Sequence, residues 1–396
     1  MKSNVESSTA DFAIIGGGIM GNATAYFLKA MSPSLSVTVI EPDPTYEFCS
    51  TLRASGGARR LFSCPENIEM SNFSIDFIKS FPQTMAVMEG GITREAPVDW
   101  VEGGYLFIVP ADGVKLLESN YAVQRKHGCD VMLMTPNELK TRFPSMRVDD
   151  LGGGVHSPCD GWCDPNGLLQ GLKRKAVSLG VVNVNDRVTS LTKTGAALTE
   201  AGLASGARVR ASMFVNAAGA WSGEVSALAD VPLPVVPMRR FEHYFTCGNP
   251  IERLPYVKDT ARLAFRSEGA GFSGGLVDGN EQRGFNFDID HDYFERVVWP
   301  AVTHRFPVFE SAKCHRTWSG LYEQCELDGN PIIGATTIDN FYVVAGFSGH
   351  GMMHAPAAGR GIAELILRGR FESIDLTRLG YARIVTGDAY REAGIL

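Results

Sequence analysis

The chain opens with residues whose types and spacing suit the binding of nucleotide phosphates. Gly16, Gly18 and Gly21 form a G-x-G-x-x-G pattern, and Glu41 follows twenty residues after the last glycine. In such a pattern the first glycine allows a tight turn, the second lets the backbone approach a pyrophosphate, and the third lets a helix pack closely on a strand. The acid accepts hydrogen bonds from a ribose. These four residues therefore predict a dinucleotide site.

A βαβ unit is needed to position these residues, and the surrounding sequence predicts one. An apolar run at 12–15 is typical of a buried strand, a helix with apolar periodicity follows at about 19–31, and a second strand at 37–40 ends at Glu41. Because an acid at this position repels the 2′-phosphate of NADP, the pattern favours NAD or FAD. FAD enzymes often carry the unit where this chain has it, close to the N-terminus.

Two later segments repeat the order of strand and small-residue turn. A strand at 208–215, which alternates like its neighbour at 187–191, ends in the turn Asn-Ala-Ala-Gly-Ala-Trp-Ser. A buried strand at 341–345 ends in Gly-Phe-Ser-Gly-His-Gly, and a helix at about 355–367 comes next. Strand, glycine turn and helix place helix-terminal N–H groups beside a ligand. We therefore expect three distant segments to build one nucleotide-binding domain.

The composition argues against several kinds of partner. The formal net charge is −7, which disfavours nucleic acid and anionic membrane surfaces. The longest apolar stretches are far shorter than a membrane span, so we expect no transmembrane segment. The first ten residues lack the apolar region of a secretory signal. A cytoplasmic location and free thiols at all eight cysteines are therefore expected.

No metal site is predicted. Three groups of residues resemble metal ligands: His156 with Cys159 and Cys163, His350 with His354, and the acidic segment 288–292. The first lacks paired cysteines, and the third lacks the glycine and distal glutamate of a calcium loop. In the second, flanking glycines place His350 in a loop rather than on a helix with His354.

Taken together, the motifs resemble those of the D-amino-acid-oxidase-like superfamily of FAD-dependent oxidoreductases. Its members include D-amino-acid dehydrogenases, glycine and sarcosine oxidases, and dimethylglycine dehydrogenases. The resemblance covers nearly the whole chain and is specific for FAD and for the fold, but not for the substrate. Besides the N-terminal glycines and Glu41, it rests on the loop 50–57, Gly-Trp-Cys-Asp-Pro at 161–165, Val-Asn-Ala-Ala-Gly-Ala-Trp-Ser at 215–222, Trp-Ser-Gly-Leu at 318–321, Asp-Gly-Asn-Pro-Ile-Ile-Gly at 328–334, and the glycine turn at 346–351.

The resemblance implies an α/β fold: a Rossmann-type FAD-binding domain with an interleaved α+β substrate domain built on a mostly antiparallel sheet. A chain of 396 residues is also too long for one simple core. We predict a discontinuous FAD-binding domain of segments 1–75, 150–235 and 330–396. The segments 76–149 and 236–329 then form the substrate domain, or cap.

The same resemblance implies which residues contact the cofactor. The predicted contacts are Gly16, Gly18, Ile19, Met20, Gly21, Glu41, Ser55, Gly56, Gly57, Val188, Ala218, Gly219, Trp221, Gly320, Gly346, Gly349, His350, Gly351 and Met352. The turn at 346–352 is expected to point backbone N–H groups at the flavin C2 carbonyl. Negative charge accumulates there on reduction, and a helix N-terminus stabilises it.

Departures from the family pattern narrow the function. In sarcosine oxidases a cysteine in the Trp-Ser-Gly-Leu region binds the flavin covalently, whereas this chain has Gly320, which implies non-covalent FAD. Those oxidases hold the substrate carboxylate with an arginine and a lysine. Phe62 and Met353 take these positions here, which disfavours a small N-methyl amino acid. The lysine that oxidases place beside the flavin is not identifiable in this chain, and Arg266 falls in that part of the sequence. The electron acceptor can therefore be either O₂ or a quinone or redox protein.

A D-arginine-dehydrogenase-like enzyme suggests a different carboxylate ligand. Its arginine after the middle strand matches Arg240 or the neighbouring Arg239, and its second arginine is replaced by Tyr322. Side chains two apart on a strand share a face, so Arg240 lies with Glu242 and Tyr244. One face of this strand should line the flavin cavity. The alternative to a carboxylate-binding role is that Arg240 forms an ion pair with Glu242.

The chemistry common to the family is hydride transfer from a C–H bond next to nitrogen to flavin N5, followed by hydrolysis of the imine. The amine must be neutral, which costs about 4 kcal/mol at pH 7 for an amine of pKa near 10, at 1.36 kcal/mol per unit. Burial in an aromatic pocket can supply such a shift. The expected pocket residues are Tyr244, Phe265, Trp318 and Tyr322, with His243 or His350 as polar contacts and Arg59 or Arg60 near flavin or substrate.

We therefore predict an FAD-dependent amine or amino-acid oxidase or dehydrogenase, with Arg240, Tyr322, His350 and Arg59 as catalytic candidates. Two alternatives remain. One is a 2-hydroxy-acid or polyol dehydrogenase, in which His350 would serve as the base. The other is a non-catalytic, FAD-binding assembly factor.

Overall fold

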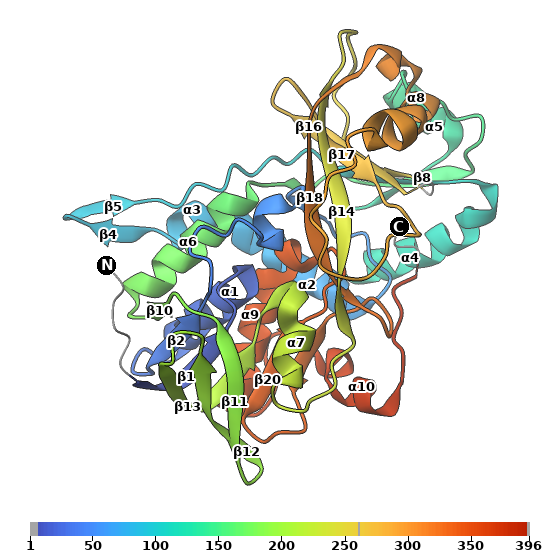
Figure 1. Ribbon diagram of the computed structural model, residues 1–396. Helices are drawn as coiled ribbons and strands as arrows, with labels where there is room; N and C mark the ends of the chain where they lie inside the picture. The colour runs from blue at the N-terminus through green and yellow to red at the C-terminus, as the bar shows by residue number, and fades with distance from the viewer. Residues whose placement is uncertain (1–6, 260–261, 394–396) are drawn as a thin grey trace.

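The computed structural model describes residues 7–259 and 262–393, and two large sheets organise this part of the chain (Figure 1). Within it, the first sheet has eight strands. Their order is β10 (Val182–Val184), β2 (Val37–Ile40), β1 (Ser8–Ile15), β13 (Arg208–Asn216), β12 (Ala197–Leu203) and β11 (Val188–Thr194), with β20 (Phe341–Ala345) on β13 and β19 (Ile332–Ala335) on β20. The strands β10, β2, β1, β13 and β20 run parallel, as the Rossmann prediction requires.

The predicted βαβ unit is present. Strand β1 leads through the glycine turn into α1 (Ile19–Met31), and β2 follows and pairs with β1. Strand β1 begins four residues earlier than predicted, because its pairing with β13 starts at Ser8. The strands expected at 208–215 and 341–345 are confirmed as β13 and β20.

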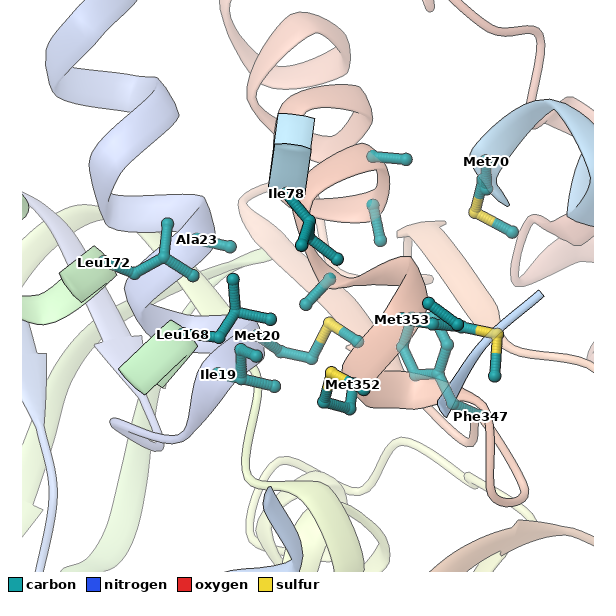
Figure 2. Close-up of a cluster of buried hydrophobic side chains, with 14 of the residues drawn as sticks. Ile19, Met20, Ala23, Met70, Ile78, Leu168, Leu172, Phe347, Met352 and Met353 are labelled. Carbon is teal, nitrogen blue, oxygen red and sulfur yellow. The ribbon is translucent and has the colours of Figure 1, made fainter. Parts of the chain in front are cut away.

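Four helices pack together beside this sheet: α1, α2 (Pro65–Lys79), α6 (Pro165–Ser178) and α9 (Gly351–Arg368). Figure 2 shows apolar side chains from all four meeting in one buried cluster. Its labelled members are Ile19, Met20, Ala23, Met70, Ile78, Leu168, Leu172, Phe347, Met352 and Met353. This packing fixes the N-termini of α1 and α9 close to each other, since Met20 and Met352 both belong to the cluster.

The helix predicted at about 355–367 begins earlier, at Gly351, and His350 directly precedes it. The prediction treated the glycines that flank His350 as part of a loop, whereas α9 already includes Gly351. In the structure Pro356 lies inside α9. Proline there removes one backbone hydrogen bond, and the apolar packing of α9 on α1 and α2 compensates for it. The helix ends at Gly369, whose φ of 72° suits glycine.

The second sheet is the mostly antiparallel sheet that was predicted. Its order is β18 (Lys313–Cys325), β14 (Val235–Thr246), β17 (Gly271–Leu276), β16 (Leu263–Glu268), β15 (Tyr256–Asp259), β6 (Tyr105–Val109), β8 (Gly153–Ser157) and β7 (Met132–Met134). Only the β15–β6 pair is parallel among these described strands. Figure 1 shows β14 and β18 as a long upright pair that extends from the region of α7 (Ser222–Ala227) to that of α8 (Trp299–Arg305).

An aromatic core covers one face of the second sheet. It is built with the π-helical turn Phe294–Val298, helix α8 and the 3-10 turn Pro307–Ser311. Its buried phenyl rings belong to Phe143, Phe245, Phe265, Phe272, Phe294, Phe306 and Phe309. The edge near β7 carries α5 (Pro136–Arg142), which starts with a capping box between Thr135 and Glu138, and α4 (Val114–Lys126).

One predicted boundary needs correction. Residues 150–157 were assigned to the FAD-binding side, but β8 pairs with β6 and β7 of the second sheet. The rest of the division into two domains stays a prediction.

The remaining elements of the described residues are two short strand pairs, two helices and four 3-10 turns. They are the pairs β3 (Gly57–Ala58) with β9 (Gly161–Trp162) and β4 (Val87–Glu89) with β5 (Ile92–Arg94), the helices α3 (Phe81–Thr84) and α10 (Ala382–Thr386), and the 3-10 turns Ser50–Arg53, Ala111–Gly113, Gly219–Trp221 and Thr377–Leu379. None of the helices in residues 7–259 and 262–393 combines the length and apolar character of a membrane span.

Candidate active site

Residues from both sheets and from the loops between them line a cavity of about 720 Å³. Most of the predicted site residues line it: Gly16, Gly18, Ile19, Met20, Glu41, Ser55, Gly56, Gly57, Arg59, Val188, Ala218, Gly219, Trp221, Arg240, Gly320, Tyr322, Gly349, Gly351 and Met352. Gly21, Gly346 and His350 lie outside this lining. Residues that are more than 300 positions apart in sequence are therefore brought to one site.

One end of the cavity is the glycine turn before α1. Gly16 has a φ of 102°, and a Cβ there would meet Cα of Ala218 at 2.7 Å, so the backbones approach too closely for a side chain. At Gly18 a Cβ would meet nothing nearer than Sγ of Cys49, at 3.6 Å. A Cβ at Gly21 would collide with the carbonyl oxygen of Gly16, so this glycine serves the packing of helix on turn and not the cavity wall.

Glu41 is held rigidly beside this turn. Its Oε2 accepts the Gly17 N–H at 2.8 Å and its Oε1 accepts the Asp43 N–H at 3.0 Å. Burial raises the pKa of Glu41, and the two backbone hydrogen bonds oppose that shift. The carboxylate lines the cavity together with Val188 and retains lone pairs that can accept hydrogen bonds from a ribose.

The middle of the cavity is shaped by close approach to the loop at 55–57. A Cβ at Gly57 would collide with the Tyr105 hydroxyl, so only glycine fits there. The Tyr105 and Tyr256 rings stack at 4.4 Å between centroids, and the Tyr256 hydroxyl donates to Oγ of Ser55 at 2.8 Å. The tyrosine pair therefore links the second sheet to the loop that crosses the cavity.

The far end of the cavity lies at the N-terminus of α9. Gly349 has a φ of 102°, and a Cβ there would collide with the Tyr322 ring, so this glycine lets Tyr322 approach the turn. Oε2 of Glu323 accepts the Gly346 N–H at 3.0 Å. Burial raises the pKa of Glu323 to about 7, against the effect of its backbone hydrogen bonds.

These features fit FAD. The N-terminus of α1 carries no side-chain cap, so its N–H groups are available to a pyrophosphate beside Gly18, and Glu41 suits the ribose. The N-terminus of α9, likewise without a side-chain cap, suits a flavin carbonyl. The cavity joins the two helix ends, as an extended dinucleotide requires.

Arg240 reaches the cavity from β14. Its guanidinium lies 4.9 Å from the centroid of the Tyr322 ring and donates to the Arg239 carbonyl and to Sδ of Met238. Its Nε is buried without a hydrogen-bond partner. Burial lowers the pKa of Arg240 from its ordinary value. No carboxylate of the described residues lies within ion-pair distance, so this cation is available to an anionic ligand.

The alternative partner, Glu242, does not bind Arg240. Its Oε1 instead accepts a hydrogen bond from Oγ of Ser273 at 2.6 Å, and Glu242 lines the cavity. Arg239 lies on the other face of β14, where it pairs with Glu281 at 3.2 Å and does not line the cavity. The choice between the two arginines, which the sequence left open, therefore falls on Arg240.

Two more basic side chains line the cavity. Arg59 stacks on Phe62 at 4.4 Å and on Phe107 at 5.4 Å, and its Nε is buried without a hydrogen-bond partner. Lys258 of β15 lies 5.9 Å from the same Phe107 ring. Burial, and then the charge of Arg59, hold the pKa of Lys258 well below its usual range. Arg60, by contrast, is bound to Asp160 at 2.8 Å away from the cavity.

His350 is not placed as predicted. It is buried behind the cavity wall, where its Nδ1 lies 3.4 Å from Nδ1 of His354 and its ring packs on Phe62. Burial and the neighbouring positive charges keep the pKa of His350 well below its usual value. His354 contacts Oγ of Ser71 at 2.9 Å, and burial lowers its pKa to about 3. The pair is therefore a neutral part of the core.

The aromatic pocket was also predicted only in part. Tyr322 lines the cavity, whereas Phe265 belongs to the aromatic core and His243 binds Oγ of Thr317 on the opposite face of β14. Tyr244 lies outside the lining, and Trp318 donates its indole N–H to the Arg53 carbonyl. Arg266 also lies outside the lining and donates from Nε to the Ser55 carbonyl. Besides Tyr322, the cavity is lined by Tyr105 of β6 and Tyr256 of β15.

Several ionisable or aromatic groups of the cavity wall had no signal in the sequence, among them Tyr105, Tyr256, Lys258 and Glu323. Glu242 was considered only as a partner of Arg240. The alternation of β14 was the one available signal for Glu242, because it places the two residues on the same face.

The thiols and the other candidate metal ligands give no further site. All eight cysteines are free. Within the described residues, no three His, Cys, Asp or Glu side chains are grouped so that they could hold a metal ion.

The fold and the cavity define a class of FAD-binding oxidoreductases. The chain belongs to the DAO family of FAD-dependent oxidoreductases, whose family model matches residues 11–365. FAD is therefore the cofactor of this family fold, and the chain is related to amino-acid oxidases and dehydrogenases.

Comparisons with individual proteins agree with this class. The chain is 35% identical to the Xenopus laevis FAD-dependent oxidoreductase domain-containing protein 1, over 98% of this chain and 85% of that protein. It is 28% identical to the mitochondrial sarcosine dehydrogenase of Mus musculus, over 95% of this chain but 42% of that protein. The crystal structure of L-proline dehydrogenase from P. horikoshii superposes with a TM-score of 0.85 at 26% identity, and covers 97% of this chain and 100% of its own.

Proposed function

We propose that this protein oxidises the C–N bond of an amine or amino acid, with an amino acid as the preferred substrate. When bound, FAD supplies an acceptor for a hydride and its two electrons. The substrate loses the hydride from the carbon next to nitrogen and becomes an imine, which water hydrolyses to a carbonyl compound and free ammonia or amine.

The observation that carries this proposal is the guanidinium of Arg240 in the cavity. Arginine binds a carboxylate with two parallel hydrogen bonds, and Arg240 has no carboxylate of the described protein in contact. The names of relatives support the same substrate class, since sarcosine and L-proline are both amino acids.

The hydroxy-acid alternative receives less support. It relied on His350 as the base that removes an alcohol proton, and His350 lies outside the cavity lining. A group that takes a proton must lie within hydrogen-bond reach of it.

The test is anaerobic reduction of the holoenzyme. Amino acids, amines, hydroxy acids and buffer alone are added in turn, and the visible absorbance of the flavin is recorded. Bleaching by amino acids, with little or none by hydroxy acids, is expected. Bleaching by hydroxy acids alone would favour the alcohol alternative, and no bleaching by any compound would favour a non-catalytic role.

A further inference from the structure

Two opposite charges face the cavity from one strand without meeting each other. Arg240 and Glu242 lie two residues apart on the same face of β14, so their Cα atoms are about 7 Å apart. Arg240 turns toward Met238 and Tyr322, while Glu242 turns toward Ser273. Since both line the cavity, a ligand can lie between them.

A substrate amino acid carries the complementary pair of charges. Its carboxylate matches Arg240, and its ammonium group matches a carboxylate such as Glu242. The ammonium group cannot react as it stands, because the nitrogen needs its lone pair to assist departure of the hydride. One proton must therefore leave the nitrogen before the hydride departs.

We propose that Glu242 accepts this proton: the ammonium N–H bond breaks, an O–H bond forms on the Glu242 carboxylate, and the substrate is left with a neutral amine. This inference rests on the proposed function of amino-acid oxidation. It limits the favoured substrates to primary, secondary or tertiary amino acids, since a quaternary ammonium group has no proton to give.

The surroundings of Glu242 suit a base that works near neutral pH. Burial raises the pKa of Glu242 to about 7, and the hydrogen bond from Ser273 opposes this shift. The charged and titratable groups that face it are Arg240 on its own strand, Tyr322 on β18, Tyr256 on β15, and Arg266 and Glu268 on β16. Arg266 lowers the pKa of Glu242 and Glu268 raises it.

The first experiment is the pH dependence of flavin reduction, measured by anaerobic stopped flow with the amino acid that bleaches the flavin best. For the wild type the rate at low substrate should fall below about pH 7, as Glu242 becomes protonated. Glu242→Gln should lose roughly 10²–10⁴-fold in rate at pH 8. Its rate should recover at higher pH, where the substrate amine is already neutral. Glu242→Asp should restore part of the rate at pH 8.

Two matched variants separate a base from a structural residue. Ser273→Ala removes the hydrogen bond that lowers the pKa of Glu242, so the acid limb should move to higher pH. Glu268→Gln makes the same substitution at a neighbouring carboxylate outside the cavity. This variant should still lose rate at low pH, and the loss should begin at slightly lower pH because Glu268 raises the pKa of Glu242. A Glu242→Gln enzyme that keeps the wild-type acid limb would overturn the proposal, as would a limb that Ser273→Ala leaves in place.

A binding experiment needs no turnover. Infrared difference spectra of pre-reduced holoenzyme, recorded at pH 8 with and without the same amino acid, detect the C=O stretch of a protonated carboxyl group. The wild type should gain this band when the amino acid binds, because Glu242 takes the proton, and Glu242→Gln should not. The same difference spectrum from both enzymes would refute the role of Glu242. If no amino acid bleaches the flavin at all, the proposed function fails before this inference is reached.

Discussion

Replacing Arg240 tests how the cavity recognises its substrate. Arg240→Met keeps an unbranched side chain that can still pack on Tyr322, which lies 4.9 Å from the guanidinium, but it removes every N–H donor. A hydrogen bond to a charged group contributes about 1.5–3 kcal/mol. At about 1.4 kcal/mol per factor of ten, KM for an amino acid should rise roughly 10- to 150-fold.

The assay compares two substrates and two variants. KM is measured for an amino acid and for the amine that lacks its carboxylate, at one pH and saturating FAD. Arg240→Met should raise KM for the amino acid and leave that of the amine nearly unchanged. Arg239→Met is the control: it removes the 3.2 Å ion pair with Glu281 on the other face of β14, so it should lower thermal stability without changing KM.

Two results would refute this reasoning. Equal increases in KM for both substrates would mean that Arg240 supports the fold of the site rather than binding a carboxylate. If Arg239→Met raised KM for the amino acid but not for the amine, the other face of β14 would bind the substrate carboxylate.

Three further predictions concern the cofactor. Acid or heat should release intact FAD into the supernatant, because Gly320 stands where a covalent linkage would need cysteine; flavin that stays with the precipitate would contradict this. The Gly18→Val protein should fold, because a Cβ there meets only Cys49 Sγ at 3.6 Å, but it should purify without FAD, because the branched side chain fills the pyrophosphate position. Gly21→Val should instead lower the melting temperature, because its side chain clashes with Gly16. A yellow Gly18→Val protein would place the pyrophosphate elsewhere. Glu41→Gln should weaken FAD binding about 10- to 150-fold, because charged hydrogen bonds of roughly 1.5–3 kcal/mol are lost. Fluorescence titration of the apoprotein with FAD measures this affinity, and lost turnover at saturating FAD would show that Glu41 does more than bind the cofactor.

Local patterns were enough to predict the nucleotide end of the site. Gly16, Gly18 and Glu41 act through their own backbone geometry and spacing, which sequence displays directly. The alternation of β14 likewise separated Arg240 from Arg239, although it did not say which face the cavity would meet. That choice depends on the aromatic core, which covers the other face of β14 at Phe241 and Phe245.

The rest of the site depends on contacts that sequence does not display. His350 sits in a glycine-rich turn typical of an active site, yet packing on Phe62 and His354 turns it into the core. Lys258 and Tyr256 belong to a short strand whose neighbours, β6 and β16, come from distant segments. The boundary at residue 150 was wrong for the same reason, because β8 is assigned only by its pairing with β6 and β7.

The central claim is that the cavity supports oxidation of a C–N bond, and product stoichiometry tests it most directly. The holoenzyme is reduced anaerobically with a limiting amount of the amino acid that bleaches it, the reaction is quenched, and flavin reduced, carbonyl compound formed and ammonia or amine released are each measured. One carbonyl compound and one ammonia or amine per flavin reduced is the predicted result. With an acyclic amino acid, reduced flavin without release of nitrogen would contradict the account.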